Sequence, residues 1–253
     1  MNERTRRAFG VDIGGSGVKG APVDLTTGEL LADVVTIPTP KPATPDAVAA
    51  TVAQLVNDAG WDGPVGVTLP CVVAGGQAQS AANVDPAWIG TDARKLFSSV
   101  LDGRDVSVLN DADAAGLAEA HFGAGKGTSG FVLMLTFGTG IGSALLHNGA
   151  LLPNSELGHL EIDGREAEHR AAASVKTREQ LSFEDWAAEV DLVLKRIEAL
   201  LWPDLFIAGG GISAEHEKWI PLLTARSPVV PAQLRNTAGI VGAAMAAATG
   251  VTP

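Results

Sequence analysis

A glycine-rich turn near the start of the chain constrains its fold more than any other feature. Residues 12–20 read Asp-Ile-Gly-Gly-Ser-Gly-Val-Lys-Gly, between an apolar stretch and a β-rich one. Glycine lets the backbone approach a ligand that a side chain would exclude, and exposed N–H groups in such a turn can surround phosphate oxygens. A second turn of this kind occupies residues 135–143. We expect the two turns to hold one phosphate group between two lobes.

Composition excludes several classes of protein. The chain has 253 residues, of which 46% are hydrophobic, enough for one large domain or two smaller ones. A formal net charge of -11 argues against nucleic-acid binding, which needs a basic face. The single cysteine, Cys71, excludes a disulfide framework and a four-cysteine zinc site. No secretory signal is evident and the apolar run at 238–248 is too short to span a membrane, so we expect a cytoplasmic protein without a membrane partner.

Apolar periodicity and turn residues predict an α/β chain built twice to one plan. The expected strands are residues 8–13, 18–24, 30–37, 65–69, 106–109, 131–136, 141–146 and 205–208. The expected helices begin at Pro45, Ala112, Phe183 and Ala238, and another follows the glycines at 209–211. We therefore expect a duplicated two-domain fold with a cleft between the domains. Residues 1–110 and 237–253 form the expected small N-terminal domain, and residues 111–236 form the large C-terminal one.

Asn110 and Asp111 lie where an expected strand ends and a helix begins. Open α/β sheets place ligand-handling residues at this position, and a carboxylate there can accept a proton from a sugar hydroxyl. The alternative is that one of the two side chains only caps the helix. In company with the glycine turns, the position favours Asp111 as a catalytic base, with Asp113 supporting the first helical turn.

Two further segments carry polar or glycine-rich patterns. Glu156, His159 and Glu168 offer carboxylates and an imidazole, which suit a polyol because each can hold hydroxyl groups. The alternative for this segment is a polar surface loop. The glycines at 209–211 join an expected strand to a helix, whose N-terminus can face an anion or a nucleotide. Their alternative role is a tight connection without a ligand.

These motifs, in this order and over nearly the whole chain, resemble the ROK family of sugar kinases and repressors, within the actin/hexokinase-like superfamily of ribonuclease H-like folds. The resemblance implies a phosphate- and nucleotide-binding set of Asp12, Gly14, Gly15, Ser16, Gly17, Lys19, Thr136, Gly138, Thr139, Gly140, Gly210 and Gly211. It implies a sugar-binding set of Asn83, Asn110, Glu156, His159 and Glu168, with Asp111 as the catalytic base.

One departure from the family pattern concerns zinc. ROK proteins usually follow the histidine with a cysteine-rich zinc motif, but residues 163–178 contain no cysteine, so we expect no zinc. The chain is also short, and in its length and its lack of these cysteines it resembles the actinobacterial polyphosphate glucokinase subgroup. Those enzymes use inorganic polyphosphate, often ATP too, to phosphorylate glucose, and some accept mannose.

The expected reaction is phosphoryl transfer from polyphosphate or ATP to the 6-hydroxyl of glucose, with Asp12 positioning Mg²⁺ through water and a homodimer implied by the resemblance. Because polyphosphate is a long anion and the chain is acidic, we expect a basic track, with candidates Lys126, Arg165, Arg170, Lys176 and Arg178. The alternatives are a strictly ATP-dependent glucokinase, a sugar-sensing regulator and an actin-like assembly protein. A regulator would need a helix-turn-helix before the first strand, where only about eight residues lie.

Overall fold

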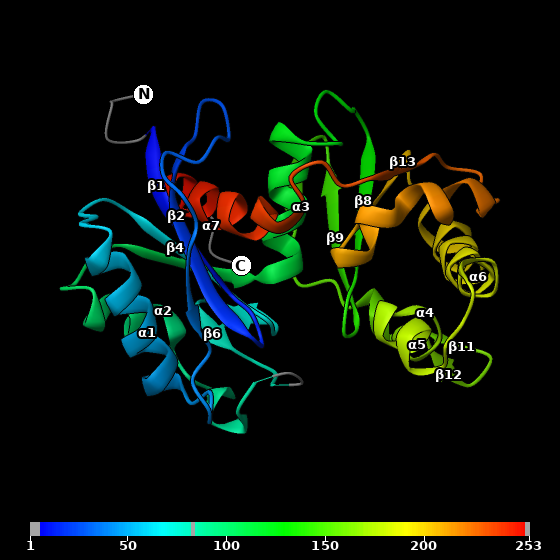
Figure 1. The fold of residues 1–253 in the computed structure, drawn as a ribbon. Helices are drawn as coiled ribbons and strands as arrows, with labels where there is room; N and C mark the ends of the chain where they lie inside the picture. Colours follow the sequence, from blue (N-terminus) through cyan, green and yellow to red (C-terminus); the bar gives the residue numbers. More distant parts are fainter. Residues whose placement is uncertain (1–5, 82–83, 251–253) are drawn as a thin grey trace. The chain divides into compact units, whose positions relative to one another are not determined.

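The computed structural model describes residues 6–81 and 84–250, and Figure 1 shows the course of the chain. The chain forms two compact units, Met1–Ala118 with Thr237–Pro253, and Glu119–Asn236. The chain first passes from one unit to the other within helix α3 (Asp111–Phe122). The division into a small and a large domain at residue 110 stays a prediction.

The first unit contains a five-stranded sheet in the order β3-β2-β1-β4-β7. β1 (Arg7–Ile13), β2 (Gly17–Asp24) and β3 (Val35–Pro38) are antiparallel neighbours. β4 (Val65–Leu69) runs parallel to β1, and β7 (Val106–Asn110) runs parallel to β4. The helices of this unit are α1 (Pro45–Asp58), α2 (Ala93–Val100), the first part of α3, and α7 (Ala238–Thr249). Its short elements are β5 (Val73–Ala74), β6 (Gln77–Ala78) and the 3-10 helix η2 (Pro86–Trp88).

α1 and α7 cover opposite faces of this sheet (Figure 1), and the side chains of β1 alternate between the two faces. Phe9 and Val11 belong to one apolar core with the buried face of α1. Gly10 lies on the opposite face, where the backbone of Ile240 in α7 occupies the space that a Cβ would need. Gly242 approaches the backbone of α3 equally closely. Gly10 of β1 therefore lets α7 lie directly on the sheet, and Gly242 of α7 lets it lie directly on α3.

The second unit repeats this plan with a five-stranded sheet in the order β10-β9-β8-β13-β14. β8 (Phe131–Phe137), β9 (Ile141–His147) and β10 (Ala150–Leu152) are antiparallel neighbours, and β13 (Leu205–Gly209) and β14 (Val229–Pro231) continue the sheet in parallel. α6 (Phe183–Leu201) buries an apolar stripe that includes Trp186, Val190 and Ile197. The same order of antiparallel and parallel strands in both units confirms the predicted duplicated α/β fold.

The remaining elements of the second unit are short. They are η3 (Leu157–His159), β11 (Glu161–Ile162), β12 (Arg165–Glu166), α4 (Ala167–Ala171), α5 (Ala173–Arg178), η4 (Gly211–Lys218), η5 (Ile220–Leu222) and η6 (Arg235–Thr237). Across the described ranges, no helix combines the length and apolarity needed to cross a bilayer.

Two sequence predictions were wrong in detail. The strand expected at 30–37 is interrupted, because Val23 and Gly20 of β2 are three residues apart while their partners Leu30 and Val35 are five apart. The two extra residues cannot pair, so they leave the ladder as in a bulge. The helix expected after the glycines at 209–211 is the 3-10 helix η4.

Candidate functional site

The first glycine turn is the tip of the β1–β2 hairpin in the first unit. The N–H of Gly14 donates to the carbonyl of Gly17 (3.0 Å), and the Thr39 hydroxyl donates to the carbonyl of Gly14 (2.6 Å). Gly15 and Ser16 are exposed at the tip. No atom lies within 4 Å of the position that a Cβ on Gly15 would take. The hairpin is therefore fixed at its base, and its tip offers backbone groups to a ligand.

Asp12 lies at the base of this hairpin. It is half-buried and stands directly across the ladder from Lys19, so the two side chains share a face. The hydroxyl of Thr68, on β4, donates to Oδ1 of Asp12 (2.8 Å) and accepts from the N–H of Ile13 (3.2 Å). A Cβ at Gly239 would lie only 2.9 Å from the carboxyl carbon of Asp12. Sequence reasoning missed Thr68, although it is the polar residue of an otherwise apolar strand.

Asn110 and Asp111 stand at the carboxyl end of β7, where α3 begins. Oδ1 of Asn110 accepts from the N–H groups of Ala112 (2.8 Å) and Asp113 (3.1 Å), and its amide donates to the carbonyl of Cys71 (3.1 Å). Asn110 therefore caps the helix, the role that the sequence left open. One amide hydrogen of Asn110 remains beyond these bonds. The cap holds Asp111, which is half-buried, as the first residue of the helix.

The second glycine turn joins β8 to β9 in the second unit. The N–H of Gly138 donates to the carbonyl of Gly140 (3.0 Å). Ser174, in α5, holds this turn from outside: its N–H donates to the carbonyl of Gly138 (3.0 Å) and its hydroxyl to that of Thr139 (2.6 Å). Gly138 and Thr139 are exposed, as Gly15 and Ser16 are in the first turn.

Thr136, Gly210 and Gly211 surround the base of the second turn. Thr136, one residue before the end of β8, pairs with Gly209 of β13. Gly210 has φ +83°, and a Cβ there would collide with the backbone of Phe137, so only glycine fits. Gly211 has open space at its Cβ position and begins η4. The motif at 209–211 is therefore packed at Gly210 against the residue that precedes the second glycine turn, and it is exposed at Gly211.

An aromatic cluster supports these two glycine motifs from the core. The ring of Phe137 meets Trp186 and Trp219 edge-on, with centroids 5.8 and 5.7 Å away, and the two indoles are 5.0 Å apart. The indole of Trp186 donates to the carbonyl of Ala171 (3.0 Å). Rigid packing beneath the second glycine turn keeps its N–H groups in fixed directions.

Carboxylates and imidazoles form a polar cluster in the second unit. His159 lies 3.3 Å from Glu166 (Nδ1 to Oε2) and 3.9 Å from Glu156 (Nε2 to Oε2). His169 also approaches Glu166 (3.5 Å) and Glu168 (3.9 Å). Oε2 of Glu168 accepts from the N–H of Ile141 (3.4 Å), directly after the second glycine turn. The predicted residues Glu156, His159 and Glu168 therefore lie together, and Glu166 is a member that the sequence did not reveal.

Ser143 and Gly158 hold the Glu156–His159 segment against β9. The buried Ser143 hydroxyl accepts from the N–H of Leu157 (3.0 Å) and donates to the carbonyl of Ser155 (2.8 Å). A Cβ at Gly158 would collide with the carbonyl oxygen of Ile141. The segment is thus positioned by the sheet and is not a free surface loop.

The cluster shifts two ionisation equilibria. Burial raises the pKa of Glu156 above its ordinary value, and the nearby negative charge of Glu168 adds to this, while His159 opposes it. The hydrogen bond with Glu166 raises the pKa of His159, and the charges of Glu168, Glu166 and Glu156 act in the same direction. The arrangement therefore favours one protonated imidazole among several carboxyl groups.

The same cluster contains side chains of the types that can bind a metal ion. Ligand atoms of His159, Glu166 and Glu168 all lie within 4.8 Å of one another, close enough for a cation to bridge them. The family's zinc motif would supply cysteines at this point, but the chain's cysteine, Cys71, is buried in the first unit. The donor set here is oxygen-rich and lacks the thiolates typical of structural zinc.

One candidate residue, Asn83, lies outside the described residues. The other candidates divide between the units, with Asp12, the first glycine turn, Lys19, Asn110 and Asp111 in the first, and the second glycine turn, the polar cluster and the motif at 209–211 in the second. Of the basic-track candidates, Arg170 donates twice to the carbonyl of Ile162 and also pairs with Glu189 (3.2 Å). Its charge is therefore already compensated within the unit.

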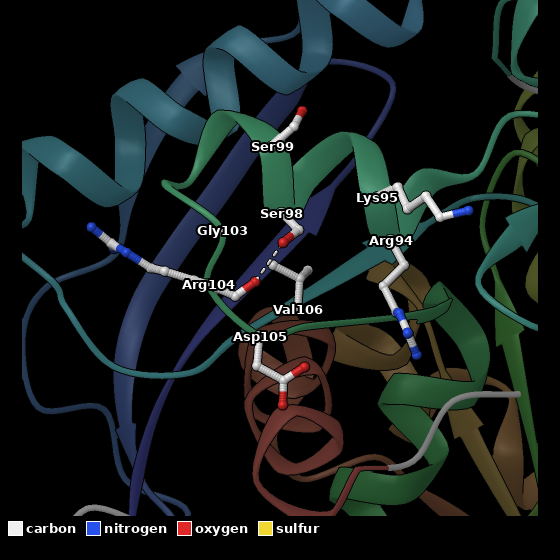
Figure 2. A pocket seen from close by; sticks show the side chains of 8 residues that line it. All are labelled: Arg94, Lys95, Ser98, Ser99, Gly103, Arg104, Asp105 and Val106. Atoms are coloured by element: carbon white, nitrogen blue, oxygen red, sulfur yellow. Dashed lines mark hydrogen bonds between the residues drawn. The ribbon is translucent and has the colours of Figure 1, made fainter.

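The first unit has a cavity of about 430 Å³, and none of the candidate residues lines it (Figure 2). It is lined by Arg94, Lys95, Ser98, Ser99, Gly103, Arg104, Asp105 and Val106. Figure 2 shows the Arg104 side chain extending away from Arg94, and its guanidinium donates to the carbonyl of Trp61. Val106 begins β7, so the cavity is at the opposite end of that strand from Asn110. Parallel strands bind ligands at their carboxyl ends, so we do not place the chemistry in this cavity.

Comparison with known proteins identifies the family to which this fold and these motifs belong. The chain belongs to the ROK family, whose model matches residues 8–174. A polyphosphate glucokinase of Mycobacterium tuberculosis is 59% identical over 98% of this chain and 93% of its own length. The crystal structure of an inorganic polyphosphate/ATP-glucomannokinase from Arthrobacter sp. strain KM is 49% identical, with a TM-score of 0.91 over 97% of this chain and 99% of that one. A ROK family glucokinase from Streptomyces griseus, 24% identical, shares the fold with a TM-score of 0.81 over 96% of this chain and 100% of that one.

Proposed function

We propose that this protein is a polyphosphate-dependent glucokinase that also uses ATP and transfers a phosphoryl group to the 6-hydroxyl of glucose. The observation that carries the proposal is the 59% identity with the mycobacterial polyphosphate glucokinase over 98% of the chain. The 49% identity with the Arthrobacter polyphosphate/ATP-glucomannokinase supports both donors. Mannose is a second acceptor in this proposal.

The acceptor side of the reaction falls to the polar groups. Asn83, Asn110, Glu156, His159 and Glu168 hold the sugar, and the carboxylates accept hydrogen bonds from its hydroxyls. Asp111 accepts the proton of the 6-hydroxyl as that oxygen attacks phosphorus. The helix cap formed by Asn110 fixes the backbone of Asp111, which supports the role of a positioned base.

The donor side falls to the glycine motifs. N–H groups of the turns at 14–17 and 138–140, with Ser16, Thr139 and Lys19, hold the terminal phosphates, and Thr136, Gly210 and Gly211 complete the nucleotide site for ATP. Such catalysis rests on positioning and charge neutralisation. The exposed tips of both turns support this assignment.

Asp12 fits the role of a magnesium-positioning residue. Its carboxylate is half-buried and is held by the Thr68 hydroxyl, and carboxylate oxygen is the ligand type that Mg²⁺ prefers. Mg²⁺ usually keeps several waters and contacts one or two carboxylates together with substrate phosphates. The bound ion would neutralise phosphate charge. We propose no zinc requirement.

Glucose 6-phosphate production with a single donor tests the proposal. Purified protein is supplied with glucose and Mg²⁺, and with either polyphosphate or ATP as sole donor, and glucose 6-phosphate is measured with a coupled dehydrogenase. We expect product with both donors. Product with ATP alone would establish the strictly ATP-dependent alternative. No product with either donor, together with sugar binding, would favour a sugar-sensing regulator, and filaments on nucleotide addition would favour an assembly protein.

Two further parts of the proposal concern the oligomeric state of the protein and its location in the cell. We propose a homodimer that works in the cytoplasm. Light scattering of the eluting protein measures the mass directly, with 25.9 kDa expected for one chain. A mass of one chain at working concentration would remove the dimer.

A further inference from the structure

We propose that Lys176 and Lys218, which converge on the ring of Phe183, hold the part of a polyphosphate donor that extends beyond the transferred phosphate. The inference rests on the proposed function and deepens its donor site. It replaces the broader basic track that the sequence suggested. All of the residues that carry it lie in the second unit.

Lys176 belongs to the helix that holds the second glycine turn. The backbone and hydroxyl of Ser174 both donate to that turn, so the first residues of α5 are fixed against it. Lys176 follows two residues later, and its Nζ lies 4.1 Å from the centroid of the Phe183 ring. A phosphate chain leaving the turn along α5 therefore meets this ammonium group next.

Lys218 reaches the same ring from the other glycine motif. η4 begins at Gly211, beside Gly210, which is packed against the backbone of Phe137. Lys218 ends η4, and its Nζ lies 5.2 Å from the centroid of Phe183. α5, which is bonded to the second glycine turn, and η4, which begins at Gly211, thus bring their lysines to one aromatic ring.

Phe183 orders both lysines in advance. Attraction between an ammonium group and an aromatic face holds each flexible side chain close to the ring. Side chains that are already ordered lose less entropy when an anion binds. Phe183 is itself fixed as the first residue of α6, which is capped by the hydroxyl of Ser182 (3.0 Å to the N–H of Asp185).

One of the two lysines at the ring also forms an ion pair. Glu215 pairs with Lys218, and the pKa of Glu215 is lowered first by the Lys218 hydrogen bond and then by the charges of Lys218 and Lys176. Glu215 is therefore the ion-pair partner of Lys218, while both ammonium groups lie over the ring of Phe183. Of the other sequence candidates nearby, Arg165 and Arg178 share Glu179 (3.4 and 3.1 Å). Lys176 has no carboxylate within ion-pair distance among the described residues.

The contact discriminates by donor length. Polyphosphate repeats its negative charge along the chain, whereas the phosphates of ATP end at a nucleoside. Ammonium groups placed beyond the glycine turns therefore gain charge contacts with polyphosphate that ATP cannot provide. Such contacts between exposed charges weaken as salt increases.

Charge-neutral variants of the full chain test this inference. We compare Lys176→Gln/Lys218→Gln with Lys195→Gln/Arg196→Gln, which removes two exposed cations from α6. In the first variant we expect KM for long-chain polyphosphate to rise about tenfold, as two exposed charge contacts allow. Its KM for ATP and kcat with ATP should change less than about twofold, on the same principle. The control variant should match the parent with both donors, and thermal unfolding checks that each variant is folded.

Direct binding gives a second readout without turnover. Long-chain polyphosphate is titrated into the protein without glucose, at several salt concentrations, and the first variant should bind more weakly and with a shallower salt dependence. An equal rise of KM for ATP and polyphosphate would overturn the inference, as would unchanged polyphosphate binding. If the parent protein used ATP but neither bound nor used polyphosphate, the proposed donor would fail as well, so the two failures are distinguishable.

Discussion

The hydroxyl of Thr68 donates a hydrogen bond to the carboxylate of Asp12 across two neighbouring strands (2.8 Å). The same oxygen accepts from the N–H of Ile13 (3.2 Å), so one hydroxyl links the end of β1 to the side chain just before the glycine turn. A carboxylate held in this way loses little freedom when it meets a cation through water. Thr68 is therefore a positioning residue for Asp12.

Removing the Thr68 hydroxyl while keeping the side-chain volume should show how much Asp12 depends on this hydrogen bond. Thr68→Val keeps the volume but leaves a backbone N–H and a carboxylate without this partner, so we expect a loss of about 1–3 kcal/mol in the free energy of unfolding. We also expect turnover to fall at least about tenfold, the usual size of the effect for groups that orient a metal-associated carboxylate. Urea unfolding and kinetics over a range of Mg²⁺ concentrations measure both.

Two matched variants interpret this result. Thr68→Ser retains the hydroxyl and should recover most of the turnover. Thr51→Val removes a hydroxyl that donates to the carbonyl of Ala47 in the preceding turn of α1 (3.0 Å), and it should leave turnover unchanged. Normal Mg²⁺ dependence in Thr68→Val would show that Asp12 does not need this bond.

Asp111→Asn should abolish most of the activity while leaving the fold intact. The amide cannot accept the hydroxyl proton as a carboxylate does, so we expect turnover to fall by about 10²–10⁴. Asp105→Asn is the matched control, because Asp105 is exposed and precedes β7 while Asp111 follows it. Turnover is measured with both donors. A rate near that of the parent protein would remove Asp111 from the role of base.

Local sequence signals predicted much of the fold. The strand at 65–69 and the helix starts at Pro45 and Phe183 follow from apolar pattern and from local capping, which Thr44 and Ser182 provide in the structure. Both glycine turns were likewise visible, since each interrupts a strand pattern. α2 escaped prediction because it is a short helix with only two buried residues, Ala93 and Phe97.

The site residues that the sequence did not reveal make contacts with residues that are distant along the chain. Thr68 meets Asp12 only because β1 and β4 pair in parallel with these two residues in register. Ser174 reaches the second glycine turn over 35 residues of sequence. Glu166 joins His159 through a two-residue strand pair that carries no apolar pattern. Tertiary packing determines the pairing register and the short surface elements, so local sequence patterns do not predict them.

The two adjacent glycines, Gly210 and Gly211, should respond differently to alanine. At Gly210 the positive φ and the collision with Phe137 both oppose a Cβ, so we expect Gly210→Ala to cost about 2 kcal/mol or more in the free energy of unfolding. Gly211→Ala has open space and should be stable, but its methyl group would occupy the ligand side and raise KM for ATP. Thermal unfolding and donor kinetics of both variants are compared. Equal stability of the two would contradict the packing assigned to Gly210.

The contact between His159 and Glu166 should control the ionisation of the polar cluster. Because the Glu166 hydrogen bond is the main cause of the raised pKa of His159, we expect Glu166→Gln to move that pKa back toward its ordinary value of 6.5. Glu161→Gln is the matched control, since Glu161 pairs with Glu166 across the β11–β12 ladder and is exposed. NMR titration of the imidazole protons measures the shift in each protein.

The same contact gives stability a pH dependence whose sign is fixed. Between pH 6.5 and the raised native pKa, folded His159 binds more protons than unfolded His159, so this contribution to stability is complete below 6.5 and is lost as pH rises through the native pKa. The loss should be smaller in Glu166→Gln than in Glu161→Gln, and denaturant unfolding at closely spaced pH values follows it. A parent-like pH dependence in Glu166→Gln would mean that the remaining carboxylates, Glu156 and Glu168, hold the proton on His159.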